Sequence, residues 1–145
     1  MTQQYKPACI SARLRHATRK ANAVYDAALH KHGINVAQFS LLRAIQRLDR
    51  PTLTDLATAT QLDASTLGRN VRVLEKGRLV HFKPGKDKRT RVLSLTDDGS
   101  RVTHAAGVDW DDVQARLKSR LGNEGYDTLF RLLDVLDTDL EGHTR

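Results

Sequence analysis

The order of apolar and polar residues divides the chain into helices and one strand-like segment. From about residue 8 to 32, apolar side chains return every three or four positions, which predicts a helix that ends at Gly33. Asn35 and Gln38 have the spacing of a capping box, so a second helix is expected to continue to about Asp49. The first third of the chain is therefore predicted to be helical.

Residues 52–77 predict two short helices joined by a tight break. Thr52 and Asp55 have capping-box spacing, and Asp63 is placed to cap the second helix. One side of that helix is apolar and carries Leu67, Val71 and Leu74. The opposite side is cationic and hydrogen-bonding, and it carries Ser65, Arg69, Arg72 and Lys76, with Thr66 and Asn70 on its flank. This division is typical of a helix-turn-helix, whose second helix reads DNA in the major groove. The alternative is a helical hairpin with a solvated basic face.

Residues 79–95 change to a strand-like pattern. Val80 and Phe82 alternate with polar residues, and a turn is predicted at Pro84-Gly85 before a second strand-like run. Three cations lie at the tip of this predicted hairpin: Lys86, Lys88 and Arg89. A hairpin with a cationic tip after a recognition-type helix is a winged helix, and its tip can reach the minor groove or the phosphates.

The end of the chain predicts two further helices. Thr96 is placed to cap a long helix, in which Gly107 permits a bend and Gly122 and Gly125 mark a break. The last helix, about residues 123–141, is apolar around most of its circumference, so it needs more than one partner. A second subunit is the expected partner, and the alternative is a core helix of a monomer.

The positively charged residues are concentrated in one part of the chain. The net charge is +7, and residues 64–91 carry nine Lys or Arg against two Asp or Glu. Residues 92–145 carry six against eleven, so the cationic density is local to the predicted reading helix and hairpin. A local cationic block is suited to the release of counterions from nucleic-acid phosphates.

The composition argues against a membrane protein, a secreted protein and a zinc-binding protein. No apolar run is long enough for a membrane helix, and no secretory h-region is present, so a cytoplasmic location without membrane attachment is expected. The single cysteine cannot form an internal disulfide. No Cys/His cluster has zinc-ligand spacing, so neither a metal nor a cofactor is predicted.

Several motifs resemble the MarR family of bacterial winged-helix regulators. They are Leu56-Ala57, Leu62-Asp63, Ser65-Thr66-Leu67, Arg69, Leu74-Glu75, Leu79-Val80, Asp87-x-Arg89 and Leu95-Thr96-x-x-Gly99. The resemblance implies a homodimer that binds pseudo-palindromic operators in double-stranded DNA, usually as a repressor, and that a small ligand or oxidation often releases. One departure is Gly77-Arg78, where the family often has a basic residue followed by glycine.

The resemblance also implies roles for residues. It places Ser65, Thr66, Arg69 and Asn70 at the major groove and Arg89, held by an ion pair with Asp87, at the minor groove. The cationic pattern adds Arg72, Lys86 and Lys88 to the expected DNA contacts. The expected fold is mainly α with a small β-hairpin, as a single domain of residues 1–145. A winged helix-turn-helix at 35–95 is flanked by dimerisation helices at 8–32 and 96–141.

The sequence contains two candidate sensor sites, a cysteine and a set of residues that could line an effector pocket. Cys9 resembles the reactive cysteine of hydroperoxide-sensing relatives, which lies close to tyrosines, and Tyr5 and Tyr25 are available here. The alternative is a small apolar residue in the dimer interface. A pocket for a small aromatic or phenolic effector would be lined by His16, Arg19, Phe39, Arg43 and Trp110. Trp110, which Asp111 and Asp112 follow, is more often a packed anchor near a polar rim than a ligand platform. The acidic run Asp109-x-Asp111-Asp112 is expected to be a solvated helix face.

Three functions compete. The leading prediction is a sequence-specific transcriptional regulator. A nonspecific nucleic-acid packager would share the basic block but have no operator. An enzyme with Cys9 as a peroxidatic thiol is the third, but the sequence offers no base–nucleophile pair, no phosphate loop and no paired carboxylates, so no enzyme is predicted.

Overall fold

The computed structural model describes residues 8–140 and is mainly helical with one antiparallel hairpin, as predicted. The elements in chain order are α1 (Ile10–Leu29), the short 3₁₀-helix η1 (His30–His32), α2 (Val36–Leu48), α3 (Leu53–Thr60), α4 (Ala64–Lys76), β1 (Val80–Pro84), β2 (Arg91–Leu95) and α5 (Asp97–Leu140). The chain forms two compact units, Met1–Trp110 and Asp111–Arg145, which divide within α5. Within the described part, no helix is long and apolar enough to cross a membrane.

The predicted caps position α2 and α3. Asn35 accepts from the backbone N–H of Gln38 at 2.9 Å, and the Gln38 side chain accepts from the Asn35 N–H at 3.0 Å. Thr52 and Asp55 form the same reciprocal pair at 3.1 and 2.8 Å. Each pair satisfies two backbone donors that the first turn of a helix leaves free. The two capping boxes and the left-handed Gly33, with a φ of 73°, are confirmed.

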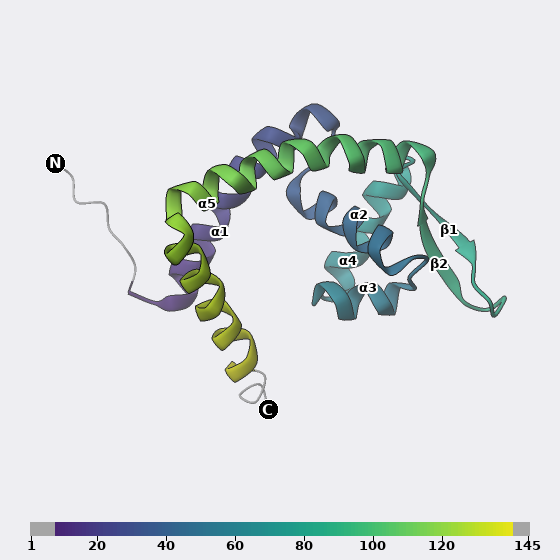
Figure 1. Ribbon diagram of the computed structural model, residues 1–145. Helices are drawn as coiled ribbons and strands as arrows, with labels where there is room; N and C mark the ends of the chain where they lie inside the picture. The colour runs from purple at the N-terminus through teal and green to yellow at the C-terminus, as the bar shows by residue number, and fades with distance from the viewer. Residues whose placement is uncertain (1–7, 141–145) are drawn as a thin grey trace. The chain divides into compact units, whose positions relative to one another are not determined.

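The core of the first unit lies where α2, α3, α4 and the hairpin meet (Figure 1). Leu42, Ile45, Leu56, Leu74 and Leu93 are all almost fully buried there. They come from four different elements, so burial of their apolar surface fixes α4 and the hairpin against the same scaffold. The hairpin extends past the helices, which leaves its far end free of the core (Figure 1).

The hairpin is anchored at its base along both strands. Its register pairs Val80 with Leu95 and Pro84 with Arg91. The N–H of Leu93 donates to the carbonyl of Pro51 at 2.8 Å, so β2 is also tied to the residue that precedes the α3 cap. Orientation of the hairpin is therefore coupled to the start of the helix-turn-helix.

The junction of β1, β2 and α5 explains the Leu-Thr-x-x-Gly motif. Thr96 Oγ1 accepts from the Gly99 N–H at 2.9 Å and donates to the Arg78 carbonyl at 2.6 Å. A Cβ on Gly99 would overlap the carbonyl of Leu79. Arg78 itself is left-handed, with a φ of 58°, whereas Gly77 is not. The departure from the usual basic–glycine order thus places a β-carbon where glycine is favoured.

The break in the last helical region lies at Gly122, whose φ and ψ are 72° and 164°. The bend that Gly107 permits does not form, because Gly122 has the only non-helical backbone within the described length of α5. Gly107 is buried, and a Cβ there would meet nothing closer than Arg43 Nη1 at 3.9 Å. Glycine permits a bend but does not require one, so the backbone hydrogen bonds continue through it. Gly125 is also helical.

The second unit exposes many apolar side chains. The exposed group comprises Leu121, Leu129, Phe130, Leu132 and Val135. Tyr126 contacts Phe130 at a centroid distance of 4.6 Å, and Lys118 Nζ lies 4.8 Å from the Tyr126 ring. The expected end of this helix at Glu141 lies outside the described residues.

Candidate nucleic-acid interface

The turn between α3 and α4 sets the direction of α4. Gln61 ends α3 in the left-handed conformation, with a φ of 54°, and the Thr60 hydroxyl donates to the Leu56 carbonyl at 2.6 Å. Asp63 then accepts from the Thr66 N–H at 2.9 Å and begins α4 as predicted. The turn of the helix-turn-helix is thus short, with Gln61 ending one helix and Asp63 capping the next.

Helix α4 has one buried side and one exposed side. Leu67, Val71 and Leu74 are 2%, 2% and 1% exposed, which fixes the helix against the core. The opposite residues Ser65, Arg69, Arg72 and Lys76 are exposed, and Thr66 and Asn70 are half-buried on the flank. The side chains predicted to read DNA are therefore available to a duplex rather than turned inward.

Asp63 organises the two hydroxyl groups at the start of α4. Its carboxylate accepts from Ser65 Oγ at 2.6 Å and from Thr66 Oγ1 at 2.7 Å, besides the cap bond. The Ser65 hydrogen bond is the largest cause that holds the pKa of Asp63 well below its usual range, followed by those from Thr66. Because both hydroxyl protons point to Asp63, the free lone pairs favour donors such as the amino groups of adenine and cytosine.

The two arginines of α4 keep most of their donors free. Arg69 Nη2 lies 3.4 Å from Thr66 Oγ1, and Arg72 Nε donates to the Gly68 carbonyl at 3.2 Å. Each contact uses one nitrogen and orients the guanidinium along the helix surface. The remaining N–H groups can pair with guanine O6 and N7 or with phosphate oxygens.

The hairpin tip is closed by hydrogen bonds of its own. Gly85 N–H donates to the Thr90 carbonyl at 2.6 Å, and Thr90 N–H to the Asp87 carbonyl at 2.9 Å. Asp87 Oδ1 accepts from the backbone N–H of Arg89 at 3.1 Å. The expected Asp87–Arg89 ion pair does not form in the described residues, since the carboxylate is used to shape the turn. Lys86, Lys88 and Arg89 are all exposed.

Two further cations border the hairpin and were missed in the sequence. Arg91 lies over the Phe82 ring at 4.1 Å, and Arg50 Nη2 donates to the Pro84 carbonyl at 3.4 Å. Arg91 follows the tip directly, and the sequence shows it as the cation that starts the second strand. Arg50 is separated from the hairpin by 34 residues, so only the fold brings it there.

Three of the five residues expected to line an effector pocket lie together in the first unit. Trp110 lies 6.0 Å from Phe39 and 6.1 Å from Tyr25 between ring centroids, and the Arg43 guanidinium lies 5.8 Å from the Phe39 ring. His16 and Arg19 lie on α1, where His16 is half-buried and Arg19 exposed. Phe39, Arg43 and Trp110 thus form one cluster, with Tyr25 as an added member.

Asp109 is not part of a solvated face, so that expectation is wrong for this residue. His32 Nε2 lies 2.6 Å from Asp109 Oδ2, and Lys31 Nζ lies 2.9 Å from Oδ1. The hydrogen bond from His32, then that from Lys31, lowers the pKa of Asp109. Asp111 and Asp112 are exposed as expected. The pairing ties α5 to the segment that follows α1.

Cys9 is the exposed N-cap residue of α1. Tyr25 is sixteen residues further along this helix, about 24 Å by the helical rise, which is too far to contact the thiol. Tyr5 lies outside the described residues. Within residues 8–140, no group of three His, Cys, Asp or Glu side chains is placed to hold a metal ion.

The chain is similar in sequence to known transcriptional regulators. Residues 32–90 match the sequence model of the MarR family. The chain is 29% identical over 119 residues to the transcriptional regulator BilQ of Clostridium symbiosum, which covers 79% of this chain and 81% of that protein. It is 27% identical over 125 residues to the regulator FarR of Neisseria gonorrhoeae, which covers 86% of both.

Solved structures share the fold over most of the chain. The regulator MosR of M. tuberculosis in complex with DNA has a TM-score of 0.84 at 28% identity, covering 94% of this chain and 99% of that one. A MarR variant from E. coli complexed with operator DNA has a TM-score of 0.79 at 25% identity, covering 86% and 91%. With its buried-and-cationic α4 and its hairpin, the chain has a winged helix-turn-helix fold, and it is similar over most of its length to MarR-family transcriptional regulators.

Proposed function

We propose that the protein is a homodimeric repressor that binds a pseudo-palindromic operator in double-stranded DNA. The observation that carries this proposal is the division of α4, whose apolar side is buried while Ser65, Arg69 and Arg72 are exposed. MosR and MarR are similar proteins whose structures contain DNA. Two copies of α4 about 34 Å apart, one turn of B-DNA, would match an inverted repeat.

The two parts of the interface have different tasks. Arg69, with Ser65, Thr66 and Asn70, contacts base edges in the major groove and gives sequence preference. Lys86, Lys88 and Arg89 at the hairpin tip contact phosphates or the minor groove and give affinity. Arg72 borders the base contacts, and Arg50 and Arg91 add positive charge where the strands meet the hairpin tip, at the Pro84–Arg91 pair.

Release from DNA follows from a shift between binding and non-binding forms of the dimer. The cluster of Phe39, Arg43 and Trp110 supports an aromatic or phenolic effector with an acidic group, because it combines aromatic faces with a guanidinium. Oxidation of Cys9 has less support, since the described residues place no tyrosine beside it.

The test compares Arg69→Ala with Arg89→Ala on the cognate operator and on random DNA over a range of salt concentrations. Loss of Arg69 should lower operator affinity by about tenfold to a hundredfold and relax base preference, because a bidentate base contact is lost. Loss of Arg89 should weaken both DNAs alike and reduce the salt slope by about one.

Equal losses on both DNAs for both variants would contradict this division. A preference for the operator below about a thousandfold at physiological salt would favour the nonspecific packager instead. Arg116→Ala, at an exposed arginine of the second unit, is the matched control and should change neither affinity.

A further inference from the structure

The connector between α2 and α3 has a backbone that its residues do not favour. Asp49 and Arg50 follow one another with positive φ angles of 50° and 61°. A residue with a β-carbon is strained in this region, and an arginine more than an aspartate. Arg50 also precedes Pro51, and the residue before a proline favours an extended backbone with a negative φ. The chain therefore holds this connector against its local preferences.

The immediate surroundings of the connector do not explain its conformation. Both side chains are exposed, and neither takes part in an ion pair within residues 8–140. The connector borders a hollow of about 250 Å³, which Gln46, Ser94 and Ser100 also line. Packing on that side therefore leaves room for a relaxed backbone. A strained conformation persists only where other contacts fix it, and such strain is typical of functional segments.

Hydrogen bonds to the hairpin supply contacts of this kind. Arg50 Nη2 donates to the carbonyl of Pro84, the last residue of β1, at 3.4 Å. The N–H of Leu93 in β2 donates to the carbonyl of Pro51 at 2.8 Å. Successive residues of the connector thus hold the two strands of the hairpin. The Arg50 bond lies next to the tip, residues 86–89, in the part of the hairpin that extends past the helices (Figure 1).

We propose that Arg50 is a positioning residue for the hairpin tip. The left-handed connector aims its guanidinium at the hairpin, and the bond to β1 fixes the direction in which Lys86, Lys88 and Arg89 point. A tip that is already placed loses less conformational entropy when it meets DNA, which offsets the strain of the connector. This inference rests on the proposed function, because the tip contacts DNA only under that proposal.

The competing role for Arg50 is direct contact with a phosphate, since its guanidinium keeps other donors free. A double-mutant cycle separates the two roles. The probe is a duplex that the wild-type protein selects from a random-sequence pool. Arg50→Ala should weaken binding of this duplex by about tenfold in wild type, but hardly at all when Lys86, Lys88 and Arg89 are already alanine. Equal losses in the two backgrounds would overturn the positioning role.

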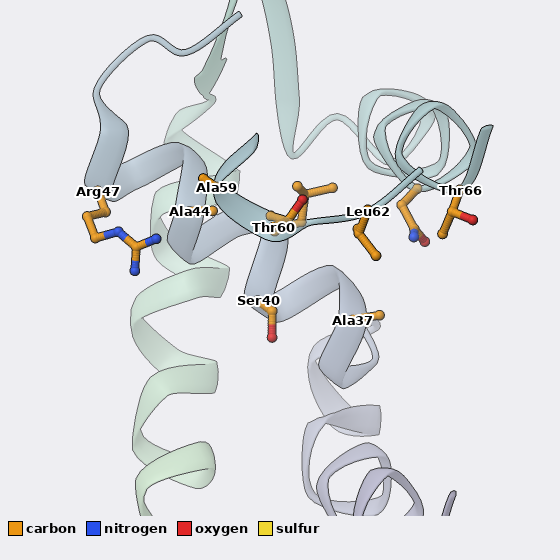
Figure 2. Close-up of a pocket in the computed structure, with 10 residues that line it drawn as sticks. Ala37, Ser40, Ala44, Arg47, Ala59, Thr60, Leu62 and Thr66 are labelled. Atoms are coloured by element: carbon orange, nitrogen blue, oxygen red, sulfur yellow. The ribbon is translucent and has the colours of Figure 1, made fainter. Parts of the chain in front are cut away.

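Arg47→Ala is the matched control for charge. Arg47 is an exposed arginine near the end of α2, and Figure 2 shows it at a hollow that Ala44 and Ala59 also line. The bond to the Pro84 carbonyl belongs to Arg50 and not to Arg47. Its loss should change affinity for the selected duplex by less than about twofold. A loss as large as that of Arg50→Ala would mean that positive charge near the end of α2 suffices, and would overturn the proposal.

Asp49→Gly and Asp49→Ala test the strain as a pair, because both remove the carboxylate and they differ only in the β-carbon. Glycine accepts a positive φ, so Asp49→Gly should unfold at a higher urea concentration than Asp49→Ala. The more flexible connector should nevertheless bind the selected duplex about threefold more weakly. Lower stability of the glycine variant, or duplex binding at least as tight as that of the alanine variant, would overturn the link between strain and positioning.

A measurement without DNA keeps the two proposals distinguishable. Backbone order parameters from NMR relaxation report the motion of residues 86–90 in the free protein. They should fall in Arg50→Ala and stay at wild-type values in Arg47→Ala. If they do so while wild type prefers no duplex over random DNA, the proposed function alone is contradicted. Unchanged order parameters in Arg50→Ala would overturn the positioning role. All substituted residues are exposed, so the variants are expected to fold, and their unfolding curves check this.

Discussion

The reading module, formed by α3, α4, β1 and β2, and the second unit, Asp111–Arg145, differ in where their apolar side chains lie. In the module, Leu56, Leu67 and Leu74 are at most 2% exposed. In the second unit, Phe130 and Leu132 are 45% and 54% exposed. A single chain can therefore complete the core of the module, whereas the apolar surface of the second unit is available to a partner.

The same contrast is visible at the helix ends. In the module, Thr52 and Asp63 satisfy the first turns of α3 and α4 by hydrogen bonds of their own. In the second unit, the backbone changes direction at Gly122, where a Cβ would meet nothing within 4 Å. Local side chains thus determine the geometry of the module, whereas a glycine with a positive φ sets the change of direction in the second unit.

The largest expected effect is a difference in stability between alanine substitutions at two glycines, which differ in the free space around them. Gly99→Ala should lower the free energy of unfolding by about 3–5 kcal/mol, because the added Cβ would overlap the backbone carbonyl of Leu79. Gly125→Ala, in the helix of the second unit, should raise it by about 0.5–1 kcal/mol, since its Cβ would meet only Leu121 Cβ at 3.6 Å. Urea unfolding measures both, and similar losses would contradict the contrast.

The second prediction concerns association. Leu132→Glu should raise the dissociation constant of the dimer by about a hundredfold, because it places a charge in the apolar surface assigned to the second subunit. Sedimentation equilibrium without DNA is the measurement. Val73→Glu is the control, since Val73 is 53% exposed but lies on α4 of the module. Monomeric wild-type protein at micromolar concentration would refute the homodimer itself.

Sequence patterns anticipated the features that depend on near neighbours. Asn35, Thr52 and Thr96 have cap partners three residues away, so their spacing alone predicts the bonds. The break at Gly122 and the apolar helix after it were also foreseen, but the uninterrupted helix through Gly107 was not. Both are glycines in helical surroundings, and only the folded chain distinguishes them.

Features that depend on distant residues were missed. Asp109 pairs with His32 at a separation of 77 residues, so its neighbours Asp111 and Asp112 gave a misleading picture of a solvated face. The Asp87–Arg89 pair was expected through side chains, whereas the carboxylate binds the backbone N–H.

The third prediction compares the replacement of an arginine by glycine in each of the two regions. Arg78→Gly should stabilise the protein by about 0.5 kcal/mol, because a φ of 58° is strained for arginine but not for glycine, while glycine adds some entropy to the unfolded chain. Arg116→Gly should destabilise it by about 1 kcal/mol, because Arg116 lies inside α5. Denaturant midpoints of the two variants give both signs, and two losses would indicate that the Arg78 side chain has a stabilising contact.

The smallest effect is the pH dependence of the α4 cap. Hydrogen bonds from Ser65 and Thr66 lower the pKa of Asp63 below its usual 3.8, so folding favours the charged form. The stabilisation is complete above about pH 4 and is lost as the pH falls from there through the folded pKa. Solvent reduces it, because Asp63 is exposed.

Asp63→Asn isolates this term from other carboxylates. Asparagine can still accept from the Thr66 N–H, but it has no charge to titrate and one acceptor oxygen fewer for the two hydroxyls. Stability measured by urea unfolding at pH 7, 4 and 3 should fall more steeply for wild type than for Asp63→Asn. The second unit offers the control, since Asp134→Asn should leave the wild-type slope unchanged. Parallel slopes for wild type and Asp63→Asn would mean that Ser65 and Thr66 do not hold the charged carboxylate in solution, and their lone pairs would then not be reserved for base donors.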